Sequence, residues 1–549
     1  MSPKPFHILV LLFMVFAAAT ADAQFSVLYN FGSNAGDPFG PHSSGVIVQG
    51  RDGNLYSTTA AGGAGDNGAV FKITPAGVVT TLYSFTSGND GCCPYGGLTL
   101  GTDSNFYGTT AFAGTYGYGT IFKITPGGTL TTLYSFGYGD GAYPSSPPVQ
   151  GRDGNWYGTV NAGGANGEGT VYKMTPAGVL TTLYNFDYTH GGQPFDPLVL
   201  ATDGNFYGTT NVGGSGGYGT IFKITPAGKL TVLYSFDGTH GGYPNGALIQ
   251  GSDRNFYGTA GNYGSNGGGV VFKMTPSGVV TVLRNLNPGT DGNYPLVGLV
   301  QASDGNFYGS NDEGGSNSDG TLFEITPKGS YSVLYNFDGT HGSEPQATPL
   351  QHTNGIVYGD AYTGGTGNVY PCTAPYCGVL YSWNNSLPAF AGLLPPLSSG
   401  KVGKVIQFLG QGFVKGKTTV TFSGNVAATV NVVSGTYLTA AVPAGALTGT
   451  VAVTTSGVTL NTLKTFRVIP QITSFRPSSG KVGTVVTITG VSLTQTTKVT
   501  FGGVAATNFT VNSDTQVTAY VPTGAKTGHI AITTPGGVAT SSGVFTVTQ

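Results

Sequence analysis

The sequence predicts an all-β protein in which a seven-bladed β-propeller is followed by two immunoglobulin-like β-sandwich domains. Two observations lead to this prediction. A pattern written approximately DGNFYGTT…GTIFKITPxGxLTTLYSF occurs seven times at intervals of 50 or 51 residues, and a different pattern then occurs twice, 80 residues apart. Fixed periods of this kind are typical of repeat architectures, in which each repeat is one supersecondary unit. The central tyrosines of the first pattern are Tyr56, Tyr107, Tyr157, Tyr207, Tyr257, Tyr308 and Tyr358.

Residues 1–23 have the features of a secretory signal peptide. Lys4 provides the positive start, residues 8–19 form an apolar core, and Ala21-Asp22-Ala23 is a small-residue cleavage site, so we expect cleavage before Gln24. The apolar run is too short for a convincing membrane span, and no later run of 18 apolar residues follows. We therefore expect an exported chain, without a membrane span after cleavage, that is periplasmic, extracellular or on the cell surface.

Each unit of the first pattern contains four short runs of β-forming residues, separated by Gly, Asn, Asp, Ser and Pro, which are the residues that turns require. Four strands are the content of one propeller blade. In one unit the runs are Ala247–Gln250, Asn255–Thr259, Val270–Met274 and Val280–Leu283. Neighbouring aromatic residues, such as Phe206-Tyr207, indicate that both faces of a strand are covered, as they are between two neighbouring blades.

The order of the strands indicates a closed ring. A strand of the LYSF type, Phe25 to Phe31, precedes the first DGN motif, whereas the last unit ends near Trp383 without such a strand after it. We expect residues 25–31 to complete the last blade, so that residues 24–385 form a propeller without exposed sheet edges. A linear β-solenoid is the alternative, and it would not need the displaced strand.

The composition changes near residue 385, where a Val/Thr/Gly pattern replaces the aromatic repeat. Residues 398–403 (SSGKVG) recur as residues 478–483, and Val420-Thr421-Phe422 recurs as Val499-Thr500-Phe501. Both copies show short alternating strands with a turn signal every 8–12 residues, which is typical of a small β-sandwich. We place the two domains at 388–469 and 470–549.

Two family resemblances follow from these motifs. The second C-terminal copy resembles an IPT/TIG domain through residues 472–480, 486–490 and 499–506, and the first copy departs from that pattern at Ala389–Gly392 and at Phe422-Ser423-Gly424. The N-terminal units resemble the GloVer tandem repeat of secreted bacterial proteins over about residues 25–383. The resemblances imply an exported bacterial protein of modular β-structure, and they imply no particular activity.

The composition excludes several classes of partner. Charged residues are 8% of the chain and the formal net charge is −2, so no basic surface for nucleic acid or an anionic membrane is indicated. The hydrophobic content of 39% is sufficient for packed cores. Gly-rich stretches lack the lysine and the following helix of a phosphate-binding loop, so we expect no nucleotide and no other cofactor.

The four cysteines form two sequence-local pairs. Cys372 and Cys377 lie in an insertion within the seventh unit, and in an oxidising compartment we expect a local disulfide between them. Cys92 and Cys93 are adjacent, and both a vicinal disulfide and two free thiols remain open for them. The spacing matches no zinc site.

One constellation could carry chemistry. The connection after each LYSF strand has the form Asp/His-Gly-x-x-Pro, and in a propeller these connections would form a ring on one face. The ring could bind a metal or act in acid–base chemistry, although residues of opposite blades would lie too far apart to share one metal. We prefer the interpretation as turns, because Asp and His before Gly bond the local backbone. The candidate ligand-binding residues are Asp90, Asp140, His190, His240, Asp291 and His341. The DGN aspartates are interpreted as hairpin turns, and we name no metal ligand and no catalytic residue.

Two functional hypotheses follow. The first is an exported, monomeric, non-enzymatic binding or adhesion protein that recognises a polysaccharide or a cell-surface protein through the propeller face, with the IPT/TIG domains as a stalk or as interaction modules. The second is an extracellular carbohydrate-active hydrolase or lyase with its site at the propeller mouth, an analogy from the fold.

An enzyme would need residues that break the repeat and converge on one face. The visible deviations are His352, Asn311-Asp312-Glu313, Glu168 and the Cys372–Cys377 insertion. Because no catalytic motif is present, we favour binding.

Overall fold

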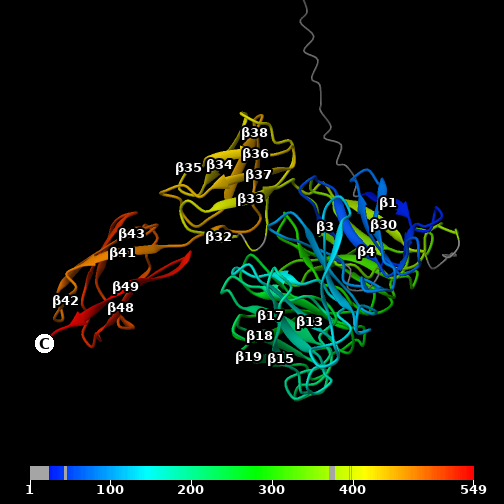
Figure 1. Cartoon of the computed structure of the whole chain (residues 1–549), viewed down its shortest axis with the longest axis horizontal. Coiled ribbons are helices and arrows are strands. Elements are labelled where there is room, and N and C mark those ends of the chain that lie inside the picture. Colours follow the sequence, from blue (N-terminus) through cyan, green and yellow to red (C-terminus); the bar gives the residue numbers. More distant parts are fainter. Residues whose placement is uncertain (1–23, 42–45, 370–376, 395, 397) are drawn as a thin grey trace, which may run out of the picture.

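The computed structural model describes residues 24–41, 46–369, 377–394, 396 and 398–549, and it confirms the all-β prediction. Its strands assemble mainly into four-stranded antiparallel sheets (Figure 1). Within these residues there is no helix with the length and apolar character that a membrane crossing requires.

Seven four-stranded sheets are built from the N-terminal repeats in the described part of the chain, and we call each sheet with its loops a blade. Blades 1 to 7 consist of β3 (Val48–Gln49), β4 (Leu55–Thr59), β6 (Ala69–Ile73) and β7 (Val79–Ser84); β8 (Thr99–Leu100), β9 (Phe106–Thr110), β10 (Thr120–Ile124) and β11 (Leu130–Ser135); β12 (Val149–Gln150), β13 (Trp156–Val160), β14 (Thr170–Met174) and β15 (Leu180–Asn185); β16 (Val199–Leu200), β17 (Phe206–Thr210), β18 (Thr220–Ile224) and β19 (Leu230–Ser235); β20 (Ile249–Gln250), β21 (Phe256–Ala260), β22 (Val270–Met274) and β23 (Val280–Asn285); β24 (Val300–Gln301), β25 (Phe307–Asn311), β26 (Thr321–Ile325) and β27 (Tyr331–Asn336); and β28 (Leu350–Gln351), β29 (Val357–Ala361), β30 (Val379–Asn384) and β1 (Gln24–Asn30). A short ribbon joins β2 (Pro38–Phe39) to β5 (Ala61–Gly62).

Aromatic residues of the second strand join each blade to its neighbour. All five residues of β17 are buried, because this strand is covered on both faces. Tyr207 stacks on Phe256 of the next blade with ring centroids 4.1 Å apart, and Tyr107 stacks in the same way on Trp156 at 3.8 Å. Trp156 is therefore a core residue. Such offset stacks bury large apolar surfaces and favour a defined geometry.

The blades form a closed ring of packing contacts. One buried cluster joins Tyr257 of blade 5 to Phe307 of blade 6, and another joins Tyr358 of blade 7 to Leu55 and Phe71 of blade 1. In blade 7 the outermost strand is β1, which pairs with β30 from Gln24↔Asn384 to Asn30↔Val379. The N-terminal strand thus lies in the last sheet rather than in the first, and it covers an edge that would otherwise be unpaired.

Two β-sandwiches follow the ring, and they share one strand order. The first contains β31 (Gly392–Leu393), β33 (Val405–Leu409), β37 (Tyr437–Ala441) and β36 (Val430–Val432), facing β35 (Val426–Ala427), β34 (Thr418–Phe422), β38 (Val451–Thr455) and β39 (Val458–Asn461), with β32 (Ser399–Gly400) beside β40 (Arg467–Val468). The second contains β41 (Gln471–Arg476), β43 (Val485–Val491), β47 (Gln516–Tyr520) and β46 (Phe509–Ser513), facing β42 (Ser479–Gly480), β49 (Gly537–Val547), β48 (Gly528–Thr534), β44 (Lys498–Phe501) and β45 (Val504–Ala505). Each has its own apolar core.

The loops of the ring lie on two faces, because successive strands of a blade run in opposite directions. The DGN face carries the turns before the second strand and after the third strand of each blade. The opposite ends carry the loops that we call the tyrosine face, which are residues 31–41, 46–47, 60–68, 85–98, 111–119, 136–148, 161–169, 186–198, 211–219, 236–248, 261–269, 286–299, 312–320, 337–349, 362–369 and 377–378.

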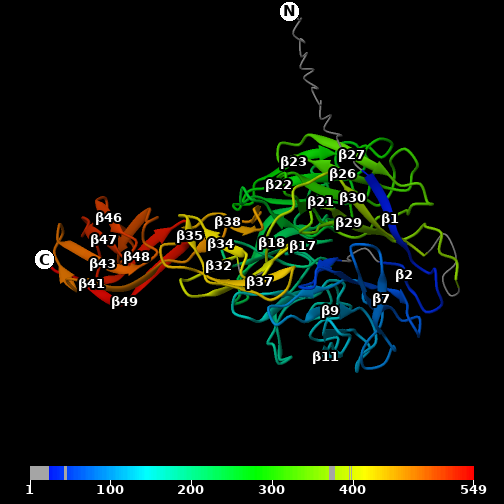
Figure 2. The ribbon, with the colours of Figure 1, turned by 90° about the horizontal axis from the view of Figure 1, so that it is seen from above.

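The first sandwich packs on the DGN face of the ring (Figures 1 and 2). Tyr437 and Leu409 of the sandwich share one buried cluster with Tyr56 of blade 1. The Arg51 guanidinium lies 4.6 Å from the centre of the Tyr437 ring and donates to Gln407 Oε1 at 2.7 Å. These contacts cover part of the DGN face, whereas the second sandwich extends away from the ring (Figure 2).

Candidate functional site

The side chains of the six residues that the sequence singled out each bond within the loop that carries them or to the outer strand that precedes it. The Asp90 carboxylate accepts hydrogen bonds from the Thr86 backbone N at 2.8 Å and from the Tyr83 hydroxyl at 3.0 Å. Asp140 accepts a hydrogen bond from the Tyr134 hydroxyl in the same way. Each of these carboxylates therefore ties a loop to the outer strand of its own sheet.

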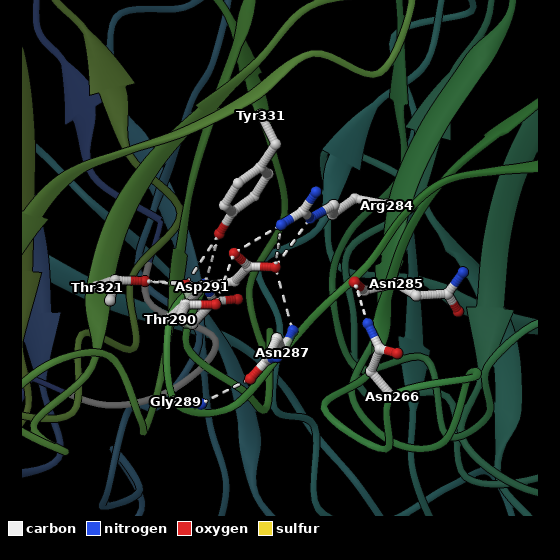
Figure 3. Close-up of polar contacts among 10 residues, drawn as sticks. Asn266, Arg284, Asn285, Asn287, Gly289, Thr290, Asp291, Thr321 and Tyr331 are labelled. Carbon is white, nitrogen blue, oxygen red and sulfur yellow. Dashed lines mark hydrogen bonds and ion pairs between the residues drawn. The ribbon is translucent and has the colours of Figure 1, made fainter.

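Asp291 is held by an arginine that replaces the usual tyrosine (Figure 3). Arg284 donates to the Asp291 carboxylate through Nε and Nη2, both at 2.8 Å, and the Asn287 backbone N donates to it at 3.1 Å. The Tyr331 hydroxyl donates to the Asp291 backbone carbonyl at 3.0 Å. A bidentate pair of this kind is among the stronger charge-assisted contacts, and here it fixes one loop conformation.

The three histidines close similar turns with an aspartate three residues earlier. Nδ1 lies 2.8 to 2.9 Å from the nearer carboxylate oxygen of Asp187, Asp237 or Asp338, and the histidine backbone N donates to the same carboxylate. Burial raises the pKa of Asp187, but the bonds from His190 outweigh it, and the pKa lies below its usual value. The histidines concerned are His190, His240 and His341.

These six side chains lie in six separate loops. In the described part of the chain no group of three or more His, Cys, Asp or Glu residues could hold a metal ion. The local hydrogen bonds support the interpretation as turns, and a ligand-binding role for the six residues stays a prediction. Asp90 also borders a shallow groove of about 530 Å³, lined in addition by Tyr83, Thr115, Thr132 and Tyr134.

The two cysteine pairs differ in state. Cys377 is disulfide-bonded, and Cys372 lies outside the described residues. Cys92 and Cys93 are free thiols with their sulfur atoms 3.1 Å apart. Burial, together with the neighbouring Cys92 thiol, raises the pKa of Cys93 to about 12, so this thiol is protonated at neutral pH.

The DGN aspartates are bonded as hairpin turns. The Asp153 carboxylate accepts hydrogen bonds from Asn155 Nδ2 at 2.6 Å and from the Tyr157 hydroxyl at 2.8 Å, and Lys173 Nζ lies 3.1 Å away. The same set recurs in other blades, so these residues stabilise the repeat.

An array of exposed aromatic side chains on the tyrosine face is the feature that sequence reasoning missed. Tyr116 is 65% exposed, and Tyr138 and Tyr188 are each 49% exposed. Two clusters lie among them. The Tyr118 ring is 5.4 Å from Tyr138 and 5.9 Å from Tyr143, and the Tyr218 ring is 5.0 Å from Tyr263 and 5.9 Å from Tyr243.

The missed signal was variation within the repeat. The core tyrosines occur in every unit, whereas the face tyrosines occupy positions that change from unit to unit. The position of Tyr118 and Tyr218, for example, is Glu168, Gly268 and Asp319 in other blades. In the sequence, aromatic residues such as Phe206-Tyr207 indicated only covered strands, and the exposed set was not distinguished from them.

Acidic residues replace aromatic ones in the sector of blades 6 and 7. Burial raises the pKa of Asp312 to about 7, although Gln346 Nε2 donates to its carboxylate at 2.8 Å. Burial and the charges of Glu313 and Asp319 raise the pKa of Glu344. Of the deviation noted at residues 311–313, Asp312 and Glu313 lie in a loop of the tyrosine face, whereas Asn311 is the buried last residue of β25. His352, by contrast, is buried on the DGN face, where Nε2 lies 3.0 Å from the Gly53 carbonyl.

Comparison with known proteins identifies the repeats and one C-terminal domain. The model of the Gloeobacter/Verrucomicrobia repeat matches residues 14–150 and 145–371, and the IPT/TIG domain model matches residues 470–548. For residues 388–469 the likeness rests on the strand order that the two sandwiches share. No curated protein matches the chain.

Similar solved structures include a fungal alcohol oxidase in complex with copper, at 15% identity over 79% of this chain and 100% of that chain, with a TM-score of 0.45. A gluconolactonase from Xanthomonas campestris is 12% identical over 65% and 99%, with a TM-score of 0.36. A surface glycan-binding protein from Prevotella bryantii is 19% identical over 27% and 38%, with a TM-score of 0.21. Likeness at this level carries no argument about function.

The repeat match extends over well more than half of the chain and coincides with the blades described above. The protein therefore belongs to the Gloeobacter/Verrucomicrobia repeat family, and it carries an IPT/TIG domain at residues 470–548.

Proposed function

We propose that this protein is an exported, non-enzymatic binding or adhesion protein whose tyrosine face contacts a polysaccharide or a cell-surface protein. The sandwiches serve as a stalk or as further interaction modules. The observation that carries the proposal is the array of exposed aromatic side chains at repeat positions that the ring does not need for its own packing. Tyrosine is enriched at recognition surfaces, since it offers a large rigid contact area and a hydroxyl group.

The two faces of the ring differ in accessibility. The first sandwich covers part of the DGN face through Arg51, Leu409 and Tyr437, as described above. On the tyrosine face Tyr116, Tyr138 and Tyr188 retain about half or more of their surface in solvent. A ligand therefore has access to the ring from the side that carries the aromatic residues.

The export part of the proposal rests on residues 1–23, which lie outside the described residues, and on the chemistry of the chain. A charged fraction of 8% and a disulfide-bonded Cys377 suit an oxidising compartment outside the cytoplasm. Fractionation of cells that express the full chain, followed by detection in medium, periplasm and surface fractions, tests this part.

The binding test uses residues 24–549 in a glycan array and in pull-down from cell-surface fractions. Replacement of Tyr138 and Tyr188 by Ser should weaken ligand capture while leaving the melting temperature unchanged, because both rings are half exposed. Val458→Ser is the matched control, since Val458 is 60% exposed on the first sandwich. Equal capture by the double variant, or no ligand for the unaltered protein, would refute the proposal.

A carbohydrate-active hydrolase or lyase is the second candidate, and the acidic sector is the observation that favours it. An acid with a pKa of about 7, such as Asp312 beside Glu344, has the proton affinity that general acid catalysis requires. Binding remains preferred because the Asp312 carboxylate is buried and bonded to Gln346. Release of reducing ends from polysaccharides that disappears in Asp312→Asn would reverse this preference.

A further inference from the structure

One position of the tyrosine face has a left-handed backbone in every blade. It is the residue directly before the proline of each connection, and we call the set the pre-proline residues. They are Gly40 (φ 63°), Cys93 (59°), Tyr143 (59°), Gln193 (54°), Tyr243 (54°), Tyr294 (52°) and Glu344 (56°). A side chain other than that of glycine is uncommon at such φ values, and for a bulky residue it is an outlier.

The fold imposes this conformation whatever the side chain is. The Tyr243 backbone N donates to the Tyr218 carbonyl at 2.8 Å, and the Tyr243 carbonyl accepts from the Gly261 backbone N at 3.2 Å. The same pair of bonds holds Glu344, at 3.1 Å to the Asp319 carbonyl and at 2.9 Å from the Tyr362 N. Since the backbone is bonded alike in blades with different side chains, the repeat does not select the side chain.

Glycine would fit this position without strain, and blade 1 uses it at Gly40. Elsewhere on the same face the chain does place glycine at left-handed positions, such as Gly119 (φ 93°) and Gly219 (φ 97°), where an added Cβ would lie 2.3 Å from a carbonyl oxygen. In a chain with 93 glycines, six blades nevertheless carry a side chain at the pre-proline position. Strained residues that a structure maintains in this way point to a function for the side chain.

The pre-proline residues lie among the exposed aromatic residues. Gln193 and Tyr294 are exposed, the Tyr143 ring is 5.3 Å from Phe112, and the Tyr243 ring is 5.7 Å from Tyr263. The backbone is constant from blade to blade and the side chains vary, which is the arrangement expected where a rigid scaffold presents specificity-determining residues.

Resting on the proposed function, we propose that the pre-proline residues are its specificity-determining contacts and that the ligand is an uncharged oligosaccharide chain lying across blades 3 to 6. Tyrosine rings stack on the apolar faces of sugar rings, and the Gln193 amide and the tyrosine hydroxyls bond sugar hydroxyl groups. The loops that define this face contain no Lys or Arg. Arg284, at the adjoining end of β23, is bonded to the Asp291 carboxylate, so among the described residues the face offers an acidic glycan no unpaired lysine or arginine.

The test replaces Tyr143, Tyr243 and Tyr294 together by Gly. Glycine suits the left-handed backbone, so the melting temperature should stay the same or rise. Affinity for a neutral polysaccharide, measured by affinity electrophoresis against a β-glucan, a xylan and a galactomannan, should fall by about tenfold or more, because buried aromatic anchors dominate recognition. Ser87→Gly is the matched control. Ser87 is also left-handed (φ 62°) and exposed on this face, but it does not precede a proline and lies outside blades 3 to 6, so its replacement should leave the affinity unchanged.

The outcomes separate this inference from the proposed function. If the unaltered protein binds a neutral polysaccharide and the triple variant binds it equally, the inference is wrong and the proposed function stands. If the protein binds only polygalacturonate or only a surface protein, the proposal of an uncharged oligosaccharide as the ligand is wrong, and the proposed binding function stands. A fall in melting temperature of the triple variant and of Tyr294→Gly shows a structural role and overturns the inference. No binding to any polysaccharide or surface fraction overturns both.

Discussion

At the scale of the residue, the same side-chain type has two roles that depend on its place in the repeat. Tyr207 is buried, as are the equivalent tyrosines of the other blades. It stacks on Phe256 of the next blade, so it stabilises the ring. Tyr243 lies at a variable position with a left-handed backbone and contacts other tyrosines at the surface. A tyrosine that, like Tyr207, occurs in every repeat is therefore a packing residue, because every blade needs the same core. A tyrosine such as Tyr243, which occurs in only some repeats, is a surface residue, because the blades can differ in the side chains that they expose.

A pH dependence of stability follows from a buried acid. Burial raises the pKa of Asp196 to about 8, although the Thr209 hydroxyl donates to its carboxylate at 3.3 Å. Between about pH 4 and pH 8 the folded state keeps a proton that the unfolded state releases, so unfolding is favoured as the pH rises. Each pH unit in this window lowers the free energy of unfolding by about 1.4 kcal/mol.

Asp196→Asn should remove this slope, since the amide keeps the hydrogen bond to Thr209 without titrating. Urea unfolding at intervals from pH 5 to pH 8 measures the effect, and the variant should become more stable than the unaltered protein as the pH rises. Parallel curves for the two proteins would contradict the prediction.

At the scale of the element, glycine fixes the hairpin between the second and third strands of each blade. In blade 4 this hairpin joins β17 to β18, and Gly219 has a φ of 97° with the Thr210 carbonyl oxygen 2.3 Å from the place of an added Cβ. Gly217 in the same hairpin has a φ of 80°, and the atom nearest to the place of an added Cβ is the Tyr188 hydroxyl oxygen, at 3.9 Å. The two glycines therefore differ in the room available for an added Cβ, although both have a left-handed backbone.

Gly219→Ala should destabilise the ring by about 2 kcal/mol or more, because the methyl group adds a steric clash to the left-handed penalty. Gly217→Ala is the control and should cost about 1 kcal/mol, which is the left-handed penalty alone. Thermal unfolding of both variants measures the difference, and equal destabilisation would show that the clash relaxes without cost.

At the scale of the whole molecule, the first sandwich covers part of one face of the ring and leaves the tyrosine face uncovered. The joint is built from residues far apart in the sequence: Arg51 contacts Tyr437 and Gln407, and the Thr436 hydroxyl donates to the Arg51 carbonyl at 2.7 Å. A second contact joins Arg467 to the Thr202 carbonyl of blade 4. These contacts hold the sandwich against the DGN face.

Arg51→Ala should loosen this joint while leaving both domains folded, since the sandwich and the ring each contain buried apolar clusters made of their own residues alone. We expect faster proteolysis between blade 7 and the first sandwich, and unchanged ligand capture by the tyrosine face. Lys415→Ala is the control, because Lys415 is exposed on the sandwich. The cleavage pattern of this variant should match that of the unaltered protein. Loss of ligand capture in Arg51→Ala would show that the two faces are coupled.

The sequence by itself determined the all-β class, the repeating sheets and the turn chemistry, because a period of 50 or 51 residues encodes local strands, turns and contacts between neighbouring blades. The match of residues 14–371 to the repeat family agrees with that analysis. The local role of residues such as Asp153 was also predictable, since its partners lie within a few residues or on the adjacent strand.

Only the tertiary structure decided which aromatic residues are exposed and which face is accessible. The pairing of Arg51 with Tyr437 joins segments that no period relates. The contact of Tyr118 with Tyr143 recurs as that of Tyr218 with Tyr243, but the repeat pattern does not show that these rings gather on an exposed face. The left-handed backbone of Tyr243 arises from hydrogen bonds across loops rather than from its own preference. Exposure and strain are properties of the assembled ring, so they follow from packing between distant segments and not from local sequence.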